Sequence, residues 1–505
     1  PALSINTYKQ TSGWDKFPTI KPIDYLPENI TVLGDLKLTL PETIPSDYKP
    51  NVSLIHDQKG TSYWQYGSLT VNGQGTLSMS EFSMTWDPNY QYVQYNRNQN
   101  YCSLVNNSHL RADNVSIYMY TRNDRWNFIT FPFDVKVSDI ETIADGTTNW
   151  VVQKYDGQKR AAGESSETWV KLNGDETLNA GEGYIIQGSR YIGTSWQEYS
   201  GFLMKAINNA NKNNIFRTTD VTVSLNEYES EFAHNRSWNL IGNPYPCYYD
   251  TRFMDFEAPI TVWNMFNNTY EAYSPSDDSY ILCPGEAFFV QRPISSGSIV
   301  FSKDGRQTNR DARTIETPSR IKASAANAHR IIVNLSLSDG NNTDRTRIVL
   351  NSKATLQYEM DKDASKFMST DATVPQIYTV YAINERPFDD GTVGLGAYIG
   401  TEGLYTIALT NEVDGFNVVL EDKMEDKRIV LTGANSYTFS AEPGTYTSRF
   451  VLHFVSETTG IDDLQADDVL QDSSALYDLS GRRIANSKLQ KGVYIQNGKK
   501  IMLNK

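Results

Sequence analysis

The sequence predicts an all-β protein of several domains, and three observations support this prediction. Tyrosine is abundant, with 31 tyrosines against five histidines in 505 residues. Short runs that alternate polar and apolar residues recur between Asn, Gly and Asp, which favour turns. Long stretches with helical spacing are scarce, and the chain is too long for one ordinary core. We expect an N-terminal β-solenoid-like segment, duplicated β modules, a C-terminal β-sandwich and a small β tail.

Residues 1–124 contain a loose repeat of short strands. The runs within 69–84 align with the runs within 104–117, and residues 32–38 offer an earlier turn of the same pattern. Asn and Gly at the corners adopt left-handed backbone conformations at low steric cost. The pattern favours the coils of a parallel β-helix or solenoid, and an ordinary antiparallel sandwich is the alternative.

Residues 125–302 contain one motif twice. The segment 126–133 matches 238–245, and the strand entry 181–187 matches 285–291 in the same order. In each copy a Trp-Asn strand meets a Pro-aromatic stop, which bars its continuation into a central ladder. We expect two copies of one fold in which the Trp and other aromatic residues form the core, with sugar stacking as the alternative role.

The two copies also carry glutamates at equivalent places, Glu182 and Glu286. They could form a catalytic pair, but a repeated Gly-Glu at a turn is more often a structural hydrogen-bonding device. Only three cysteines are present, too few for a disulfide framework. One pair could form, Cys247 with Cys283, and three buried thiols are the alternative.

The last third of the chain predicts a linker, a sandwich and a tail. Residues 303–328 form a polar run of mixed charge, as linkers do. Residues 329–456 then hold nine strand-like runs at short spacing, which indicates a β-sandwich of jelly-roll or immunoglobulin type. These runs are 330–337, 345–351, 376–383, 393–399, 403–410, 416–422, 428–433, 436–441 and 447–455. In 457–505, Ser-Gly and Asn-Gly turn pairs separate short apolar runs, which indicates a small β unit.

This tail resembles the C-terminal sorting-type domain of exported and surface proteins from Bacteroidetes bacteria. The residues that carry the resemblance are 477–484, 491–495 and the basic end at 499–505. The string at 238–246 is similar to a recurrent structural module of those proteins, and the sandwich at 329–456 resembles the one that precedes their tails. The resemblance implies secretion or attachment to the cell surface, in association with the outer membrane, and it implies no enzymatic role.

Charge and hydropathy exclude two classes of partner. The net charge is −14 and the isoelectric point is near 5.0, so no basic face is expected to neutralise nucleic-acid phosphates. No apolar run approaches the roughly 18 residues of a membrane helix, so we expect no membrane span. The chain starts Pro1-Ala2-Leu3 without a signal-peptide pattern. We expect a processed product, or the C-terminal part of a longer chain.

Catalytic and metal chemistry find little support in the sequence. The five histidines are scattered without zinc-site spacing, and neither a nucleophile elbow nor a P-loop occurs. We therefore predict no catalytic residue, no metal ligand and no cofactor. The acidic loops at 339–344 and 361–363 could bind Ca²⁺ through oxygen ligands, although solvated turns are the default.

Two function classes remain. The first is a secreted or surface-attached, non-enzymatic binding or adhesion protein that recognises a glycan or a host or cell-surface protein. Its aromatic faces would stack on sugar rings. The candidate ligand-binding residues are expected to be exposed in one loop: Trp86, Tyr90, Tyr92 and Tyr95. The second class is a polysaccharide-active lyase or hydrolase with its site in or upstream of the N-terminal solenoid. The tyrosine-rich, acidic, β-only character of the chain favours the first.

Overall fold

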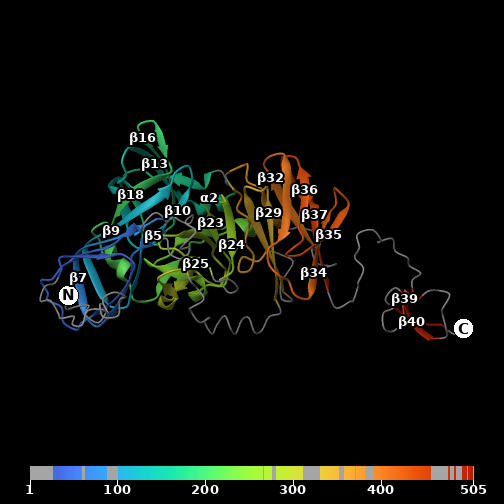
Figure 1. Cartoon of the computed structure of the whole chain (residues 1–505), viewed down its shortest axis with the longest axis horizontal. Helices are drawn as coiled ribbons and strands as arrows, with labels where there is room; N and C mark the ends of the chain where they lie inside the picture. The colour runs from blue at the N-terminus through green and yellow to red at the C-terminus, as the bar shows by residue number, and fades with distance from the viewer. Residues whose placement is uncertain are drawn as a thin grey trace.

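The computed structural model describes residues 27–59, 63–87, 101–164, 167–265, 267–275, 280–310, 330–351, 358–369, 371–380 and 392–456, together with four short strands of the tail. Strands dominate it, which confirms the all-β class. Figure 1 shows the chain running from an N-terminal segment, through a central body, to a sandwich and the tail. Among the described residues no helix is long and apolar enough to cross a bilayer.

Two parallel sheets make up the N-terminal segment, and the chain visits them alternately. The first sheet contains β1 (Asn29–Val32), β3 (Asn51–Leu54), β7 (Thr76–Trp86) and β9 (His109–Arg122). The second contains β2 (Asp35–Leu40), β6 (Ser68–Gly73) and β8 (Ser103–Asn106). A two-stranded hairpin of β4 (His56–Lys59) and β5 (Tyr63–Tyr66) interrupts the alternation. The register pairs Leu69 with Leu104 and Phe82 with Val115, as the repeat aligns them.

The first of these sheets continues into the central body. Strand β9 pairs antiparallel with β18 (Tyr199–Lys205), which in turn pairs with β12 (Glu141–Thr142). Strands from beyond residue 124 therefore complete a sheet that begins before it. The parallel arrangement ends at β9, where the antiparallel strand β18 joins the sheet. The expectation of a complete solenoid therefore stays a prediction.

Gly73 shows why glycine occupies a corner of this segment. Its φ is +104°, and a Cβ at this position would lie 2.3 Å from the Leu40 carbonyl oxygen. Any side chain would meet both a backbone clash and a strained conformation. The two neighbouring turns of chain can thus approach closely only because this residue is glycine.

Two sheets with the same strand order form the central body. The first copy contains β10 (Asn127–Ile129), β16 (Tyr184–Ile192), β13 (Thr147–Tyr155) and β14 (Trp169–Lys171), with β17 (Ser195–Gln197) beside β16. The second contains β20 (Trp238–Gly242), β26 (Ala287–Gln291), β23 (Ile260–Asn264) and β24 (Thr269–Tyr273). Asn127 opposes Ile186 as Asn239 opposes Val290, so the registers agree.

Smaller sheets and a short helix connect these copies. The helix α2 (Gly157–Ala161) follows β13, and β11 (Val135–Lys136) pairs with β15 (Thr177–Leu178). The second copy carries two three-stranded sheets of its own. The first contains β19 (Val221–Ser224), β27 (Ser298–Phe301) and β22 (Met254–Asp255). The second contains β25 (Ile281–Leu282), β21 (Tyr248–Asp250) and β28 (Arg306–Gln307). The stretch expected to be a linker, 303–328, begins with ordered structure, since strand β28 at 306–307 pairs with β21. Residues 311–329 lie outside the described residues.

Among the described residues from 330 to 456, nine strands in two sheets form a sandwich, where nine strand-like runs were expected. One sheet contains β29 (Arg330–Ser338), β30 (Thr343–Asn351), β33 (Gly403–Leu409) and β36 (Tyr437–Ala441). The other contains β31 (Gln376–Val380), β32 (Thr392–Ile399), β34 (Phe416–Asp422), β35 (Lys427–Leu431) and β37 (Gly444–Ser456). Alternate side chains from both sheets form one buried core, which includes Leu335, Ile407, Leu420 and Leu452.

Four short strands form one sheet in the tail. They are β38 (Leu476–Tyr477), β39 (Arg483–Ile484), β40 (Gly492–Gln496) and β41 (Lys499–Leu503). A small β unit was expected here. Its role in sorting stays a prediction.

Candidate functional site

The described segment 358–369 packs the sandwich against the second module copy. The ring of Phe367 lies 4.7 Å from the ring of Trp238, and the Arg160 guanidinium lies 4.1 Å from the Phe367 ring centroid. Beside it, Lys366 donates to both carboxylate oxygens of Asp344 at 2.7 Å. Phe367 therefore packs the segment on the module copies, and the buried Lys366–Asp344 ion pair fixes the same segment to β30 of the sandwich.

Aromatic side chains from both copies meet in one layer between their sheets. Phe128 of the first copy lies 5.9 Å from the rings of Trp263 and Phe289 of the second. Tyr155 lies 4.7 Å from Phe289, and the Trp263 indole donates to the Trp126 carbonyl at 2.9 Å. The predicted core role of these aromatics fits this packing, and the Phe128 contact and the indole hydrogen bond hold the Trp263 ring in place.

A cavity of about 220 Å³ opens beside this layer, where three parts of the chain meet. The N-terminal segment contributes Trp86 and Tyr101, and the first copy contributes Phe128. The second copy contributes the most, from the ends of β23 and β24 to the turn before β26. We call this hollow the central cavity.

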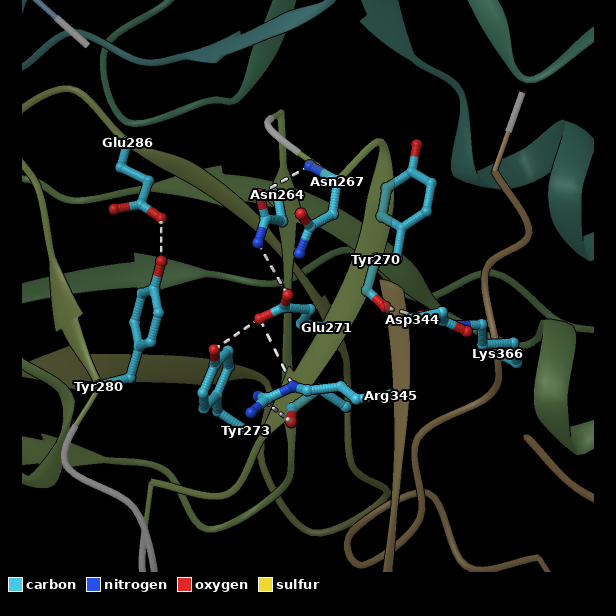
Figure 2. A network of polar contacts seen from close by, with 11 residues as sticks. Asn264, Asn267, Tyr270, Glu271, Tyr273, Tyr280, Glu286, Asp344, Arg345 and Lys366 are labelled. Carbon is cyan, nitrogen blue, oxygen red and sulfur yellow. Dashed lines mark hydrogen bonds and ion pairs between the residues drawn. The ribbon is translucent and has the colours of Figure 1, made fainter. Parts of the chain in front are cut away.

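A carboxylate network forms the polar wall of the central cavity (Figure 2). Glu271 on β24 accepts hydrogen bonds from the Asn264 amide at 2.8 Å and from the Tyr273 hydroxyl at 2.7 Å. Arg345 of the sandwich lies 3.4 Å from the same carboxylate and 4.1 Å from the Tyr273 ring centroid. The pairing of β23 with β24 sets Asn264 opposite Thr269, which makes Asn264 and Glu271 diagonal neighbours on one face of the sheet.

A second carboxylate lies on the same wall. Glu286 accepts from the Tyr280 hydroxyl at 2.6 Å and from the Cys283 amide at 2.7 Å. The Tyr280 ring is 4.4 Å from the Tyr273 ring, so the two tyrosines connect the two glutamates (Figure 2). A carboxylate has about four lone-pair positions, so each glutamate keeps acceptor capacity for a ligand.

Electrostatics keep the cavity's tyrosines and cysteine protonated. Burial and the Glu271 carboxylate raise the pKa of Tyr273, and burial and Glu286 raise the pKa of Tyr280. Burial raises the pKa of the Cys283 thiol to about 12. At neutral pH the hydroxyls are therefore hydrogen-bond donors, and the thiol is a poor nucleophile.

The predicted ligand-binding loop is only partly described. Trp86 is 1% exposed and its ring lies 6.0 Å from the Phe131 ring, so the expectation of an exposed Trp86 is wrong. Its buried position follows from its place at the end of β7, where its ring stacks on Phe131 of the first copy. Tyr90, Tyr92 and Tyr95 lie outside the described residues. Of the four candidates, the structure brings Trp86 to the central cavity.

The equivalent glutamates Glu182 and Glu286 both serve as hydrogen-bond acceptors at their turns. Glu182 accepts from the Tyr184 hydroxyl at 2.8 Å and from the Asn179 amide group at 3.2 Å. These contacts agree with the structural interpretation of the repeated Gly-Glu. The cysteines Cys102, Cys247 and Cys283 are free and buried.

The acidic loops considered for Ca²⁺ use their carboxylates within the turns. Asp339 accepts from the amides of Asn341 at 2.8 Å and Asn342 at 2.6 Å. Asp363 accepts from the Glu359 amide at 2.8 Å. Among the described residues no group of three or more His, Cys, Asp or Glu could hold a metal ion.

Sequence reasoning missed the glutamate on β24. The strand registers make Glu271 equivalent to Val170 in the first copy, because Glu271 opposes Val262 and Val170 opposes Lys154. A carboxylate where the other copy carries valine is a signal that the aligned repeats could have given. Finding this signal requires an alignment of the outer strands β14 and β24, and the matched motifs do not include those strands.

Comparison with known proteins gives one match. The family described as "Domain of unknown function (DUF8693)" is similar to residues 247–454, less than half of the chain. No curated protein and no solved structure matches. The matched range runs from the second module copy through the sandwich, and it includes Glu271, Arg345 and Phe367.

Proposed function

We propose that this protein is a secreted or surface-attached, non-enzymatic binding or adhesion protein, and that the central cavity takes the end of a glycan. The observation that carries the proposal is the meeting of aromatic rings with hydrogen-bonding carboxylate and amide groups in one cavity. Sugar rings present apolar faces that stack on aromatics and hydroxyls that bond to such acceptors.

The size of the cavity favours a terminal sugar. Small-molecule pockets usually span about 300–1,000 Å³. The central cavity holds about 220 Å³, enough for one ring rather than a run of rings. The sugar hydroxyls would donate to the free lone pairs of Glu271 and Glu286, and the ring face would contact Trp263 or Phe128.

A glycan array on the full chain, followed by titration of any hit with tryptophan fluorescence as the readout, tests this proposal. We expect Glu271→Gln and Tyr280→Phe each to weaken binding about tenfold. The first replaces a charged acceptor oxygen by an NH2 donor, and the second removes a hydroxyl from the wall. The matched control is Trp196→Ala. Trp196 is 43% exposed on the hairpin of β16 and β17, where it opposes Tyr191.

The outcomes separate three interpretations. Loss of binding in the cavity variants with unchanged Trp196→Ala binding supports the central cavity. Loss in Trp196→Ala alone would move the glycan site to the exposed hairpin and overturn the cavity assignment. No hit on the array would overturn glycan recognition and favour a protein partner.

The enzyme alternative has one observation in its favour, two glutamates in one cavity, since glycoside hydrolysis commonly uses two carboxylates. Each of the four carboxylate oxygens already accepts one hydrogen bond. The donors are Asn264 and Tyr273 for Glu271, and Tyr280 and the Cys283 amide for Glu286. A polysaccharide depolymerisation screen on the same sample decides between the classes. Release of products that Glu286→Gln abolishes would replace the binding proposal with an enzyme.

A further inference from the structure

A second hollow, of about 360 Å³, lies at the other end of strands β7 and β9. Its lining includes Thr76 at the start of β7, His109 and Arg111 at the start of β9, and Arg217 and Thr219 after the short helix Lys212–Phe216. We call it the basic groove. None of its described lining residues is acidic.

Arg217 has an environment that is unusual for an arginine. Its guanidinium is partly buried and forms no ion pair among the described residues. Burial lowers the pKa of Arg217, as expected for a cation that loses water without gaining a carboxylate. Partial burial of a charged group without an acidic partner is unfavourable, and a bound anion would offset this penalty. The whole chain offers more acids than bases, 60 against 46, so the lack of an acidic partner in the described part of the chain is notable.

The neighbouring arginines add positive charge with few acidic partners. Arg306 donates to the carbonyl oxygens of Asn106 at 2.6 Å and Arg217 at 3.3 Å, and to the Asn107 side chain at 2.8 Å. These acceptors are neutral, so they leave its charge uncompensated. Arg111 donates from Nε to the Ser78 hydroxyl at 2.7 Å.

Two acidic residues adjoin the lining in sequence, Asp113 and Asp220, and each accepts a hydrogen bond from a lysine outside it. Asp113 lies 2.9 Å from the Lys49 ammonium. The hydrogen bond from Lys49 is the main cause of the lowered pKa of Asp113, and the charge of Arg111 lowers this pKa to a smaller extent. Asp220 accepts from the Lys303 amide at 2.8 Å. The groove thus concentrates positive charge on a protein that is acidic as a whole.

We propose that the basic groove binds a tetrahedral oxyanion, a sulfate or phosphate group, held by Arg217 and Arg111 with the threonine hydroxyls of the rim. Arginine presents a planar fork of donors that matches oxyanions in pairs of hydrogen bonds. Thr76, Thr218 and Thr219 supply neutral donors on the same lining. The group can be a free ion or a substituent on a larger ligand, such as a sulfated sugar.

This site is separate from the central cavity. Strand β7 has 11 residues and touches the groove with Thr76 and the cavity with Trp86. A strand rises about 3.3 Å per residue, which separates the two sites by roughly 30 Å. Either proposal can therefore fail without the other.

Isothermal titration calorimetry of the full chain with sodium sulfate and with sodium phosphate, at constant ionic strength set by chloride, tests the proposal. We expect saturable binding of at least one ion. Arg217→Gln should weaken it about tenfold or more, since a charge-assisted contact is lost. Arg217→Lys should recover part of the affinity, because it restores the charge without the fork.

The control variant is Arg428→Gln. Arg428 is an exposed arginine of the sandwich that already pairs with Glu421 at 3.3 Å. Equal weakening in Arg428→Gln, or absence of saturable binding in the wild type, would overturn the proposal. If circular dichroism shows that Arg217→Gln is misfolded, Arg111→Gln, on the exposed rim, decides in its place. Parallel titrations with a sulfated polysaccharide and its unsulfated parent distinguish a free ion from a sulfated ligand.

Discussion

Thr130 and Gly242 occupy equivalent positions in the two module copies and touch each other. The Thr130 amide donates to the Gly285 carbonyl at 3.0 Å, and the Gly242 amide donates to the Gly181 carbonyl at 3.2 Å. Gly181 and Gly285 are themselves equivalent, so the two hydrogen bonds are related by the duplication. Each copy ends its first strand on the turn of the other, which joins the copies into one body.

This contact predicts that Gly242→Ala destabilises the protein. A Cβ at Gly242 would lie 2.0 Å from Thr130 Cγ2, so one copy must shift. We expect a loss of roughly 1–3 kcal/mol of unfolding free energy, as for overpacking in a core. Thr130→Gly in the same chain should recover much of this loss, and a double-mutant cycle by urea denaturation measures the coupling.

Gly433→Ala is the control for this experiment. Nothing lies within 4 Å of a Cβ at Gly433, so we expect a change within about 0.5 kcal/mol. Additive effects of Gly242→Ala and Thr130→Gly would contradict direct contact between the copies.

Trp238 and Trp126 are equivalent in the sequence repeat, but we expect their replacement by alanine to lower the unfolding free energy by different amounts. Trp238 is 1% exposed, donates to the His234 carbonyl at 2.8 Å and contacts Phe367, whereas Trp126 is only partly buried. Trp238→Ala should cost about 3–5 kcal/mol, and Trp126→Ala clearly less. Urea denaturation of the two variants checks the ranking. Equal losses of unfolding free energy in the two variants would mean that the contact with Phe367 adds little to the core around Trp238.

Much of this architecture could be predicted because local patterns record it. The motif match predicted which positions of the two copies are equivalent, and the strand registers agree with it: Phe128 opposes Ile185 as Leu240 opposes Phe289. Alternation such as that at Phe450 and Leu452 on β37 likewise reveals which side chains point into the sandwich.

The central cavity could not be predicted because its walls come from distant parts of the chain. Glu271 meets Arg345 only through the docking of the sandwich, and Trp86 reaches the cavity only through the pairing of β7 with β9. The burial of Trp86 has the same cause: its partner ring, Phe131, follows it by 45 positions in sequence. Sequence spacing does not encode such contacts.

The three buried thiols predict a clear result in a thiol titration. Burial raises the pKa of Cys102, Cys247 and Cys283 to about 12, so their thiolate fraction at pH 8 is very small. The native protein should react slowly with a disulfide reagent, and the unfolded protein should show three thiols at once. A count of one thiol after unfolding without reductant would instead reveal a Cys247–Cys283 bridge.

The buried ion pair of the sandwich predicts how stability depends on pH. Asp422 is fully buried and accepts from Arg449 at 2.8 Å and from the Tyr437 hydroxyl at 2.9 Å. Burial alone would raise the pKa of Asp422, but the hydrogen bonds from Arg449 and Tyr437 outweigh it and hold the pKa below its ordinary value. The stabilisation is therefore present above the unfolded-state pKa of about 3.9 and is lost as the pH falls through the lower folded value.

Asp422→Asn should remove this dependence and destabilise the sandwich at pH 7. The substitution leaves the Arg449 charge buried without its partner, which typically costs about 3–5 kcal/mol. Guanidinium denaturation between pH 2 and pH 7 measures both effects, and the variant should show a flatter acid limb than the wild type. The control, Glu425→Gln, changes an exposed carboxylate of the adjacent turn and should shift stability by no more than about 0.5 kcal/mol. An unchanged acid limb in Asp422→Asn would show that other carboxylates set the pH dependence, because the linkage relation requires a group with a lowered folded pKa to contribute to that slope.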